Sequence, residues 1–183
     1  MLALLAANVA NVNLRRHMLA AEAVMRALAA RLGEDPDTWG LAGLAHDLDA
    51  ERTGTDFARH GAVAAAELAD LGAAPEVTRA VAAHNPATGV VAAARLDVAL
   101  VACDQVTGLV TAATLVRPDK AIAGVRVKSL RKRMREGAFA RGVDRASIAR
   151  CEEIGVALDD FLALALQAMQ EIAADLGLEG ALA

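Results

Sequence analysis

The feature that most constrains the fold of this chain is a helical spacing of apolar residues that continues from end to end. Alanine is abundant, valine and isoleucine are modest in number, and no segment alternates apolar and polar residues as a half-buried strand does. The 183 residues suit one domain, and a hydrophobic content of 56% is enough for a substantial core. We therefore predict an all-α protein that folds as a single domain over residues 1–183.

Capping residues and prolines divide the pattern into separate helices. Asn13 is a suitable cap for a helix over residues 14–32, and Asp35 followed by Pro36 starts a second helix that ends near His46. The other expected helices are one capped by Thr55 or Asp56 that carries His60 in its first turns and reaches Leu71, one over residues 75–84, one over 90–116, and a pair over 144–176 that is broken near Gly155.

Charge and composition exclude several classes of partner. The net charge of −4 and the pI of about 5.6 give no reason to expect DNA binding, and 2% aromatic residues leave little to stack on single-stranded nucleic acid. The apolar opening, residues 1–7, lacks a charged flank and is too short to span a membrane. Cys103 and Cys151 lack CxxC spacing, so we expect both to be reduced and buried in a cytoplasmic protein.

The histidines form an ordered set. All four lie in the first half of the chain, one of them is followed directly by an aspartate, and a second aspartate comes later: His17, His46, Asp47, His60, His84 and Asp104. Neutral imidazoles combined with carboxylates suit transition metals better than they suit hard oxygen-seeking ions. Helical bundles build metal sites from side chains that project inward from several helices. The alternative is that each histidine is an ordinary core or surface group.

The surroundings of these residues carry a family resemblance. His17, then His46-Asp47 within Gly-Leu-Ala-His-Asp-Leu-Asp, then Asp104 within Ala-Cys-Asp-Gln-Val-Thr-Gly-Leu resemble the HD-domain metal-dependent phosphohydrolase superfamily. The resemblance covers roughly residues 14–115. It implies an HD-domain helical bundle, with additional C-terminal helices over about 126–183 packed on the core as in small HDIG-type bacterial and archaeal HD hydrolases.

The same resemblance implies two metal ions. Binuclear members of the superfamily add two histidines between the His-Asp pair and the last aspartate, and His60 and His84 occupy that interval. By resemblance, the first ion would bind His17, His46, Asp47 and Asp104, and the second would bind His60 and His84, with Asp47 bridging both ions as the catalytic residue. The expected ions are divalent Mn or Fe, with Co, Ni or Zn as alternatives, and a mononuclear form stays open. Asn85 follows His84 where HD-GYP enzymes carry a second histidine, and the chain has no tyrosine for a Gly-Tyr-Pro signature, which disfavours a cyclic-di-GMP phosphodiesterase.

The function implied is hydrolysis of a nucleotide or another small phosphate ester by a metal-activated water. The chain offers no Gly-x-Ser-x-Gly elbow and no phosphate-cradling glycine-rich loop, so metal would have to supply the chemistry. Two other classes stay open: a di-iron HD-fold oxygenase, which uses the same ligands, and a non-catalytic nucleotide-binding module.

The sequence also contains candidate substrate-binding residues. Arg16, Lys128 and Arg131 could contact a substrate phosphate, although the basic segment 126–135 that holds the last two is expected to be a solvated helix face. Asp49 and Glu51 are expected to be solvated acids in a charged loop. Asn85 and Thr107 could hydrogen-bond a substrate, but a helix stop and a buried hydroxyl already have ordinary roles. Alanine and leucine in the C-terminal helices would suit a homodimer interface.

Overall fold

The computed structural model describes residues 2–180, and the fold over this range is all-α, as predicted. The only β-type pairing among these residues is an isolated antiparallel bridge between Ala121 and Glu179. Met1 and residues 181–183, which belong to the predicted single domain, lie outside the described residues. The α-helices are α1 (Leu2–Asn8), α2 (Val12–Leu32), α3 (Pro36–Ala45), α4 (Ala50–Thr53), α5 (Ala62–Asp70), α6 (Pro75–Ala83), α7 (Arg95–Leu115), α8 (Val127–Met134), α9 (Arg145–Ala149), α10 (Leu158–Glu171) and α11 (Ala173–Leu176), and short 3₁₀ turns cover Pro86–Thr88, Ile122–Gly124 and Arg150–Ile154.

The helix starts near the histidines follow from local capping. Asp35 caps α3 by accepting from the backbone N–H groups of Asp37 and Thr38, with Pro36 at the first helical position as predicted. The cap of α2 is Asn11, which accepts from the N–H groups of Asn13 and Leu14, so the prediction of Asn13 was wrong by two residues.

The third predicted helix begins later than expected. Residues 54–61 form turns, and α5 starts only at Ala62, so His60 lies in a loop instead of in the first turns of a helix. Gly61 has a φ of +84°, a left-handed conformation that a side chain would disfavour, and an added Cβ would lie 2.9 Å from the Val81 carbonyl oxygen. The chain therefore turns sharply at Gly61 and brings the loop against the end of α6.

The long helix also starts later than predicted. Residues 90–94 are not helical, and α7 begins at Arg95 because Asp97 accepts from the N–H groups of Ala93 and Ala94. The end of the helix, just before Pro118, was predicted correctly.

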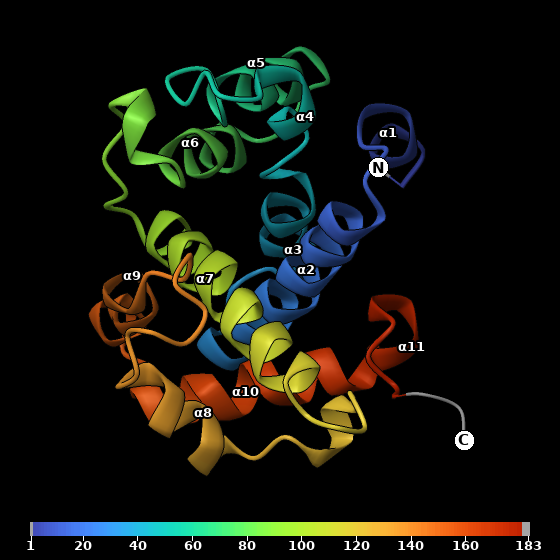
Figure 1. Ribbon diagram of the computed structural model, residues 1–183. Helices are drawn as coiled ribbons and strands as arrows, with labels where there is room; N and C mark the ends of the chain where they lie inside the picture. The colour runs from blue at the N-terminus through green and yellow to red at the C-terminus, as the bar shows by residue number, and fades with distance from the viewer. Residues whose placement is uncertain (1, 181–183) are drawn as a thin grey trace.

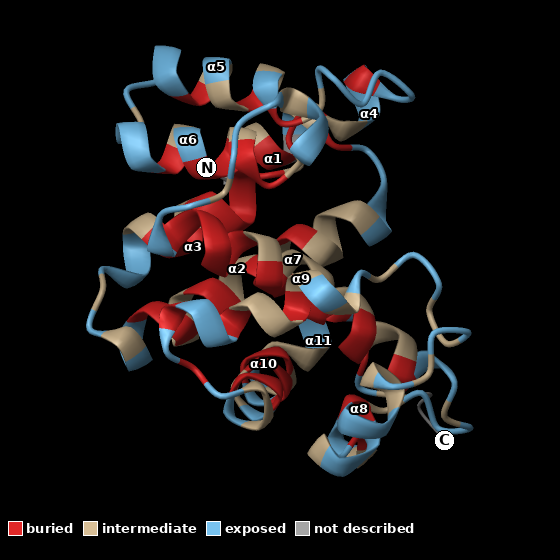
Figure 2. Cartoon of the chain, turned by 90° about the vertical axis from the view of Figure 1, so that its left-hand side faces the viewer, coloured by how far each residue is buried: buried red, intermediate tan, exposed pale blue. Residues whose placement is uncertain are grey.

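The core forms where α2 packs against α3 on one side and against α7 and α10 on the other. Figure 2 shows that these helices are buried over much of their length, whereas α5 and α8 expose their outer faces. The largest fully buried side chains include Met18 and Leu28 of α2, Leu100 of α7 and Phe161 of α10. Helices α5 and α6 pack on each other at one end of the molecule, and α8 lies at the other end (Figure 1).

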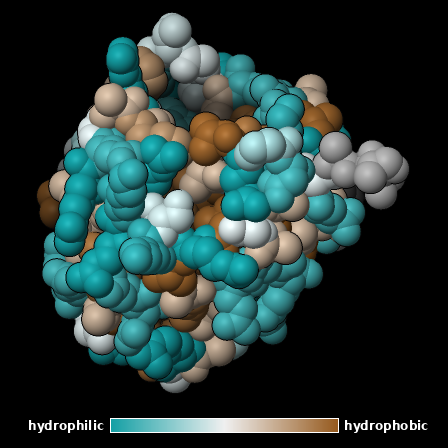
Figure 3. Space-filling model, turned by 60° about the horizontal axis from the view of Figure 1, so that its bottom comes forward, coloured by the Kyte–Doolittle hydropathy of each residue, from teal (hydrophilic) through white to brown (hydrophobic). Residues whose placement is uncertain are grey.

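The C-terminal helices pack on the core. Helix α10 lies against α2, α7 and α8, and α9 lies against α7. Helix α8 buries Leu130 and exposes Lys128, Arg131 and Lys132, as expected for a solvated face, while Arg133 is half-buried over the Phe139 ring. Figure 3, which views the molecule from the end formed by α8 and α10, shows hydrophilic side chains over most of this face, with smaller apolar patches between them.

One described helix, Arg95–Leu115, is long and apolar enough to cross a membrane by length and composition alone. Its burial inside the protein, 61% over the apolar window, is what a core helix of this fold requires. Cys103 and Cys151 are free and buried, as predicted. Burial raises the pKa of Cys103 and raises that of Cys151 to about 12, so neither is suited to nucleophilic chemistry.

Candidate metal centre

The four histidines and two aspartates singled out in the sequence converge in space. His17 projects from α2 and Asp104 from the middle of α7, while His46 and His84 stand at the C-terminal ends of α3 and α6. Asp47 follows His46 where α3 has ended, so two adjacent side chains point to the same place, which they would not do inside a helix. His60 reaches the same point from the loop over residues 54–61.

The first cluster contains His17, His46, Asp47 and Asp104. The Nε2 atoms of His17 and His46 are 3.2 Å apart. Asp104 Oδ1 lies 2.9 Å from His17 Nε2 and 3.8 Å from His46 Nε2. Asp47 Oδ2 lies 3.6 Å from His17 Nε2 and 3.3 Å from His46 Nε2.

The second cluster uses the other oxygen of the same aspartate. Asp47 Oδ1 lies 3.2 Å from His60 Nε2 and 3.6 Å from His84 Nε2, and these two nitrogens are 3.2 Å apart. Asp47 therefore directs one carboxylate oxygen to each cluster, which is the position of a bridging ligand.

These separations are those of atoms that share a metal ion. Nitrogen and oxygen ligands about 2.1 Å from one ion are about 3.0 Å apart at a right angle and about 3.4 Å apart at a tetrahedral angle. The measured distances within the two clusters fall around these values. Imidazole and carboxylate donors suit Mn, Fe, Co, Ni or Zn. The residues present therefore fit divalent transition-metal ions.

Helix ends fix the orientation of two of the histidines. His46 Nδ1 lies 2.8 Å from Gly43 O, and His84 Nδ1 lies 2.6 Å from Val81 O. A carbonyl can only accept, so each Nδ1 carries the hydrogen and each Nε2 presents a lone pair to the cluster. Both carbonyls belong to the last turn of a helix, where no backbone N–H is available to them.

Side chains orient the other two histidines. Thr107 donates its hydroxyl hydrogen to Asp104 O at 2.7 Å and accepts from His17 Nδ1 at 3.1 Å. Asp49 Oδ1 accepts from His60 Nδ1 at 2.9 Å. All four Nε2 atoms therefore face the clusters, where the neutral form of each imidazole would offer a lone pair to a metal ion, and ligands oriented by a second partner bind metal more tightly.

Asp49 is a functional residue that sequence reasoning missed. It was expected to be solvated, but its side chain is fully buried and also accepts from the N–H groups of Gly61 and Ala64 at 2.8 Å each. Burial raises the pKa of Asp49, but the hydrogen bonds from His60, Ala64 and Gly61 outweigh burial and leave the pKa lowered. Asp49 is thus an ionised carboxylate that holds both His60 and the turn into α5. The charged segment around Asp49 did not predict its burial, because the groups that bond its carboxylate lie 11 to 15 residues further along the chain.

Asn85 also supports His60. Its side-chain amide donates to Phe57 O at 2.6 Å and to His60 O at 2.9 Å, while its oxygen accepts from the N–H of Ala87. Asn85 follows His84 directly, so it ties the His60 loop to the helix end that carries His84. Glu51, the other acid expected to be solvated, is exposed but accepts from the N–H groups of Ala10 and Asn11, next to the start of α2.

The electrostatics of the clusters favour bound cations. Burial raises the pKa of Asp47 and of Asp104, but facing histidines outweigh burial and leave both values lowered. Burial lowers the pKa of His46, yet Asp47 and Asp104 bring it well above the usual value. Hydrogen bonds to Asp47 and Asp49 raise the pKa of His60 to about 9. A site that draws protons this strongly onto its imidazoles also attracts metal ions, which compete for the same lone pairs.

The three candidate phosphate-binding residues lie in two different parts of the molecule. Arg16 lines a hollow that adjoins His17. Lys128 and Arg131 lie on α8, at the opposite end of the molecule from α5 and α6 (Figure 1), and Arg131 pairs with Asp159 at 2.6 Å. Lys128 and Arg131, which could have contacted a substrate phosphate, therefore do not lie at the clusters, because α8 folds against α10 and not over the histidines.

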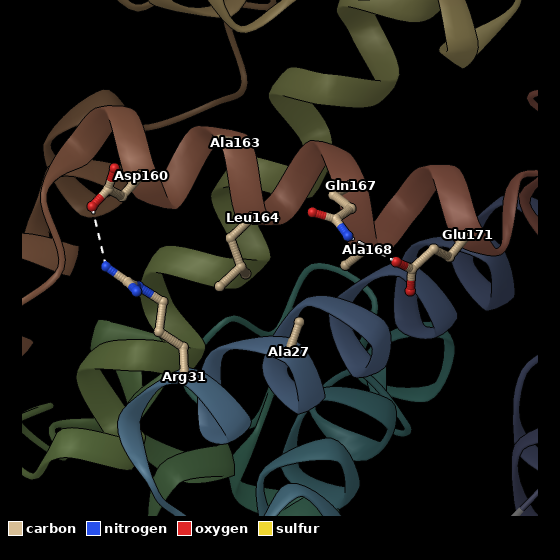
Figure 4. Close-up of a pocket in the computed structure, with 8 residues that line it drawn as sticks. All are labelled: Ala27, Arg31, Asp160, Ala163, Leu164, Gln167, Ala168 and Glu171. Carbon is tan, nitrogen blue, oxygen red and sulfur yellow. Dashed lines mark hydrogen bonds and ion pairs between the residues drawn. The ribbon is translucent and has the colours of Figure 1, made fainter.

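Another hollow lies between α2 and α10, away from the clusters (Figure 4). Arg31 pairs with Asp160 at 3.1 Å on one side of it, and Gln167 donates to Glu171 on the other. None of its lining residues belongs to the clusters, and of its polar contacts only the Arg31–Asp160 pair joins α2 to α10.

Taken together, an all-helical fold and two histidine–carboxylate clusters that share one aspartate define a helical protein with a candidate metal centre. The family model of the HD domain matches residues 14–101, so this part of the chain is an HD domain. The match includes five of the six cluster residues, and Asp104 follows three residues beyond it on the same helix. HD domains bind divalent metals, and the superfamily includes metal-dependent phosphohydrolases. The searches for similar curated proteins and for similar solved structures give no match to this chain.

Proposed function

We propose that this protein is a metal-dependent phosphohydrolase that cleaves a nucleotide or another small phosphate ester. The observation that carries the proposal is the division of the Asp47 carboxylate, with Oδ2 facing His17 and His46 and Oδ1 facing His60 and His84. A carboxylate shared in this way holds two ions close together, which is the arrangement that phosphoryl-transfer sites use.

The cluster residues and their hydrogen-bond partners have different roles. His17, His46, Asp47 and Asp104 would hold one ion, and Asp47, His60 and His84 the other. Two bound divalent ions, with Mn or Fe as the first candidates, would activate a water molecule and neutralise charge on the phosphoryl group. Thr107 and Asp49 keep their histidines in the ligating orientation. The side chains of His17, Asp104 and His60 are 20–25% exposed, so one side of the centre is open to a substrate.

A di-iron oxygenase is the main competing function, because it would use the same six ligands. The experiment is therefore phosphate release from a panel of nucleotides and phosphomonoesters with Mn or Fe supplied, together with oxygen uptake by the iron-loaded protein. We expect phosphate release that is lost in Asp47→Ala and retained in Asp56→Asn, a control that neutralises an exposed carboxylate nearby. Oxygen uptake without phosphate release, in protein with verified metal content, would contradict the proposal.

A further inference from the structure

A hollow of about 400 Å³ adjoins the metal centre on the side of His17. Its walls come from α2, from the C-terminal half of α7 and from the end of α11. The lining residues are Asn13, Arg16, His17, Gly108, Thr111, Ala112, Leu115, Leu176, Gly177 and Leu178.

The hollow continues the face of α7 that carries a cluster residue. Asp104, Gly108, Thr111 and Leu115 are spaced by four, three and four residues, so they form one stripe along the helix. Asn13 and His17 are likewise one turn apart on α2. A ligand whose phosphate occupies the metal centre could therefore extend directly along this stripe. The small residues Gly108 and Ala112 leave room for it.

Arg16 supplies a positive charge to this hollow. Among residues 2–180, no hydrogen bond or ion pair of the Arg16 side chain is found, in contrast to the side chains of Arg26, Arg117 and Arg150, which pair with carboxylates. Its guanidinium lies against Gly177, where an added Cβ would come within 2.5 Å of Nη2. The charge is thus held next to α11, and no described contact joins it to the histidines or aspartates of the clusters.

The remaining lining restricts the ligand further. Leu115, Leu176 and Leu178 give the hollow an aliphatic side, and Asn13 and Thr111 offer an amide and a hydroxyl. No phenylalanine, tyrosine or tryptophan lines it, and the one imidazole in the lining, that of His17, is directed to the first cluster, so the hollow offers a base no large aromatic ring to stack on.

We propose that this hollow binds the part of the substrate beyond the scissile phosphate, and that Arg16 pairs there with a second anionic group. The substrate class is then a phosphate ester of a short aliphatic or sugar-like compound that also carries a carboxylate or a second phosphate. This inference rests on the proposed function, because it takes the metal centre as the site of the first phosphate.

The test is calorimetric binding of three probes to the Mn-loaded protein: inorganic phosphate, propylphosphonate and 3-phosphonopropionate. The last two differ only by a methyl and a carboxylate at the far end. A charge-assisted pair with Arg16 should make 3-phosphonopropionate bind about tenfold more tightly than propylphosphonate. Arg16→Gln should abolish that difference and leave the affinity for propylphosphonate unchanged. Arg135→Gln, which removes one exposed charge from the end of α8, should preserve the difference.

Each failure has its own meaning. Equal affinity for the two phosphonates, or a difference that survives Arg16→Gln, would overturn the assignment of the hollow and leave the phosphohydrolase proposal intact. An equal loss of affinity for all three probes in Arg16→Gln would place the guanidinium on the metal-bound phosphate, which also overturns it. Absence of binding of every probe to metal-loaded protein would overturn both proposals.

Discussion

The two clusters that share Asp47 are built in different ways. In the first, His17 and Asp104 stand within long helices, and His46 stands at the end of a helix that is itself buried in the core. In the second, His84 stands at a helix end, but His60 comes from the turns over residues 54–61. The first cluster is therefore positioned by packing of the core.

The second cluster depends on polar contacts that hold a loop. Asp49 accepts from His60 and from the backbone on either side of the turn into α5, and Asn85 donates to two carbonyls of the loop. Buried contacts of a core element open only with the whole fold, whereas a loop opens locally at a lower free energy. We therefore expect substitutions of the residues that support the ligands to weaken the second site more than the first.

The largest effect is expected from Asp47→Asn, which changes both clusters at once. Neutralising the shared carboxylate should lower the metal content from two ions per chain to almost none. Each ion at a thousandfold excess over its Kd stabilises the folded state by about 4 kcal/mol, so the loss of each ion corresponds to about 8–16 °C in melting temperature for a domain of this size. Metal analysis and thermal melts with and without chelator measure both quantities.

The comparison with chelator-treated native protein serves as the control for this variant. If Asp47 acts through metal, the variant should melt close to the metal-free native protein, and chelator should change it little. Two ions retained per chain in Asp47→Asn would show that Asp47 is not the bridging residue.

His60→Ala should separate the two clusters. The variant removes one of the three residues of the second cluster and none of the first, so one ion per chain should be lost and one retained. His17→Ala is the matched variant in the first cluster. It should lose the first ion and, with it, the stabilisation of the folded state that this ion provides. A His60→Ala protein that still holds two ions would contradict the assignment of the ligands.

Asn85→Asp should weaken the second ion without removing a ligand. The substitution keeps the size of the side chain but replaces the two N–H donors with a carboxylate oxygen, which would repel the Phe57 and His60 carbonyls. Loss of a group that supports a metal ligand typically costs 10- to 100-fold in affinity, so we expect about that decrease for the second ion alone. Thr78→Val in the first turn of α6 removes a hydroxyl that bonds Pro75 O and has no described contact with Asn85 or His60, and it is the control. Equal weakening of both ions would show that Asn85 acts on the whole fold.

The same contrast explains which parts of the molecule were predictable from sequence. The helices predicted over residues 14–32 and 90–116 follow from apolar spacing, so the inward positions of His17 and Asp104 were accessible although the observed helices, Val12–Leu32 and Arg95–Leu115, start elsewhere. Asp35-Pro36 marked the start of α3, and Asn85-Pro86 marked the end of α6 directly after His84. Local signals decide these features, and local signals are what a single sequence contains.

The features that were missed depend on contacts between distant segments. The loop that holds His60 read as the start of a helix because Thr55 and Asp56 are good caps, but the left-handed turn at Gly61 and its contact with α6 override that preference. The burial of Asp49 and the distance of Lys128 and Arg131 from the clusters depend on how α5 and α8 pack. The residues next to them in the sequence do not predict that packing.

The smallest effect should come from Thr107→Val, which tests the support of the first cluster. Valine has the shape of threonine, so the core should remain packed, but His17 Nδ1 loses the hydroxyl that accepts its hydrogen. Because core packing also holds His17, we expect the affinity for the first ion to fall only about three- to tenfold. This is the change in affinity that corresponds to the loss of one hydrogen bond. Thr107→Ser should restore the native value, and Thr114→Val, which removes a comparable buried hydroxyl two turns along α7, should leave metal affinity unchanged. Metal titrations of these variants decide the matter: a loss in Thr107→Val as large as that in Asn85→Asp would mean that the first cluster depends on polar contacts as much as the second.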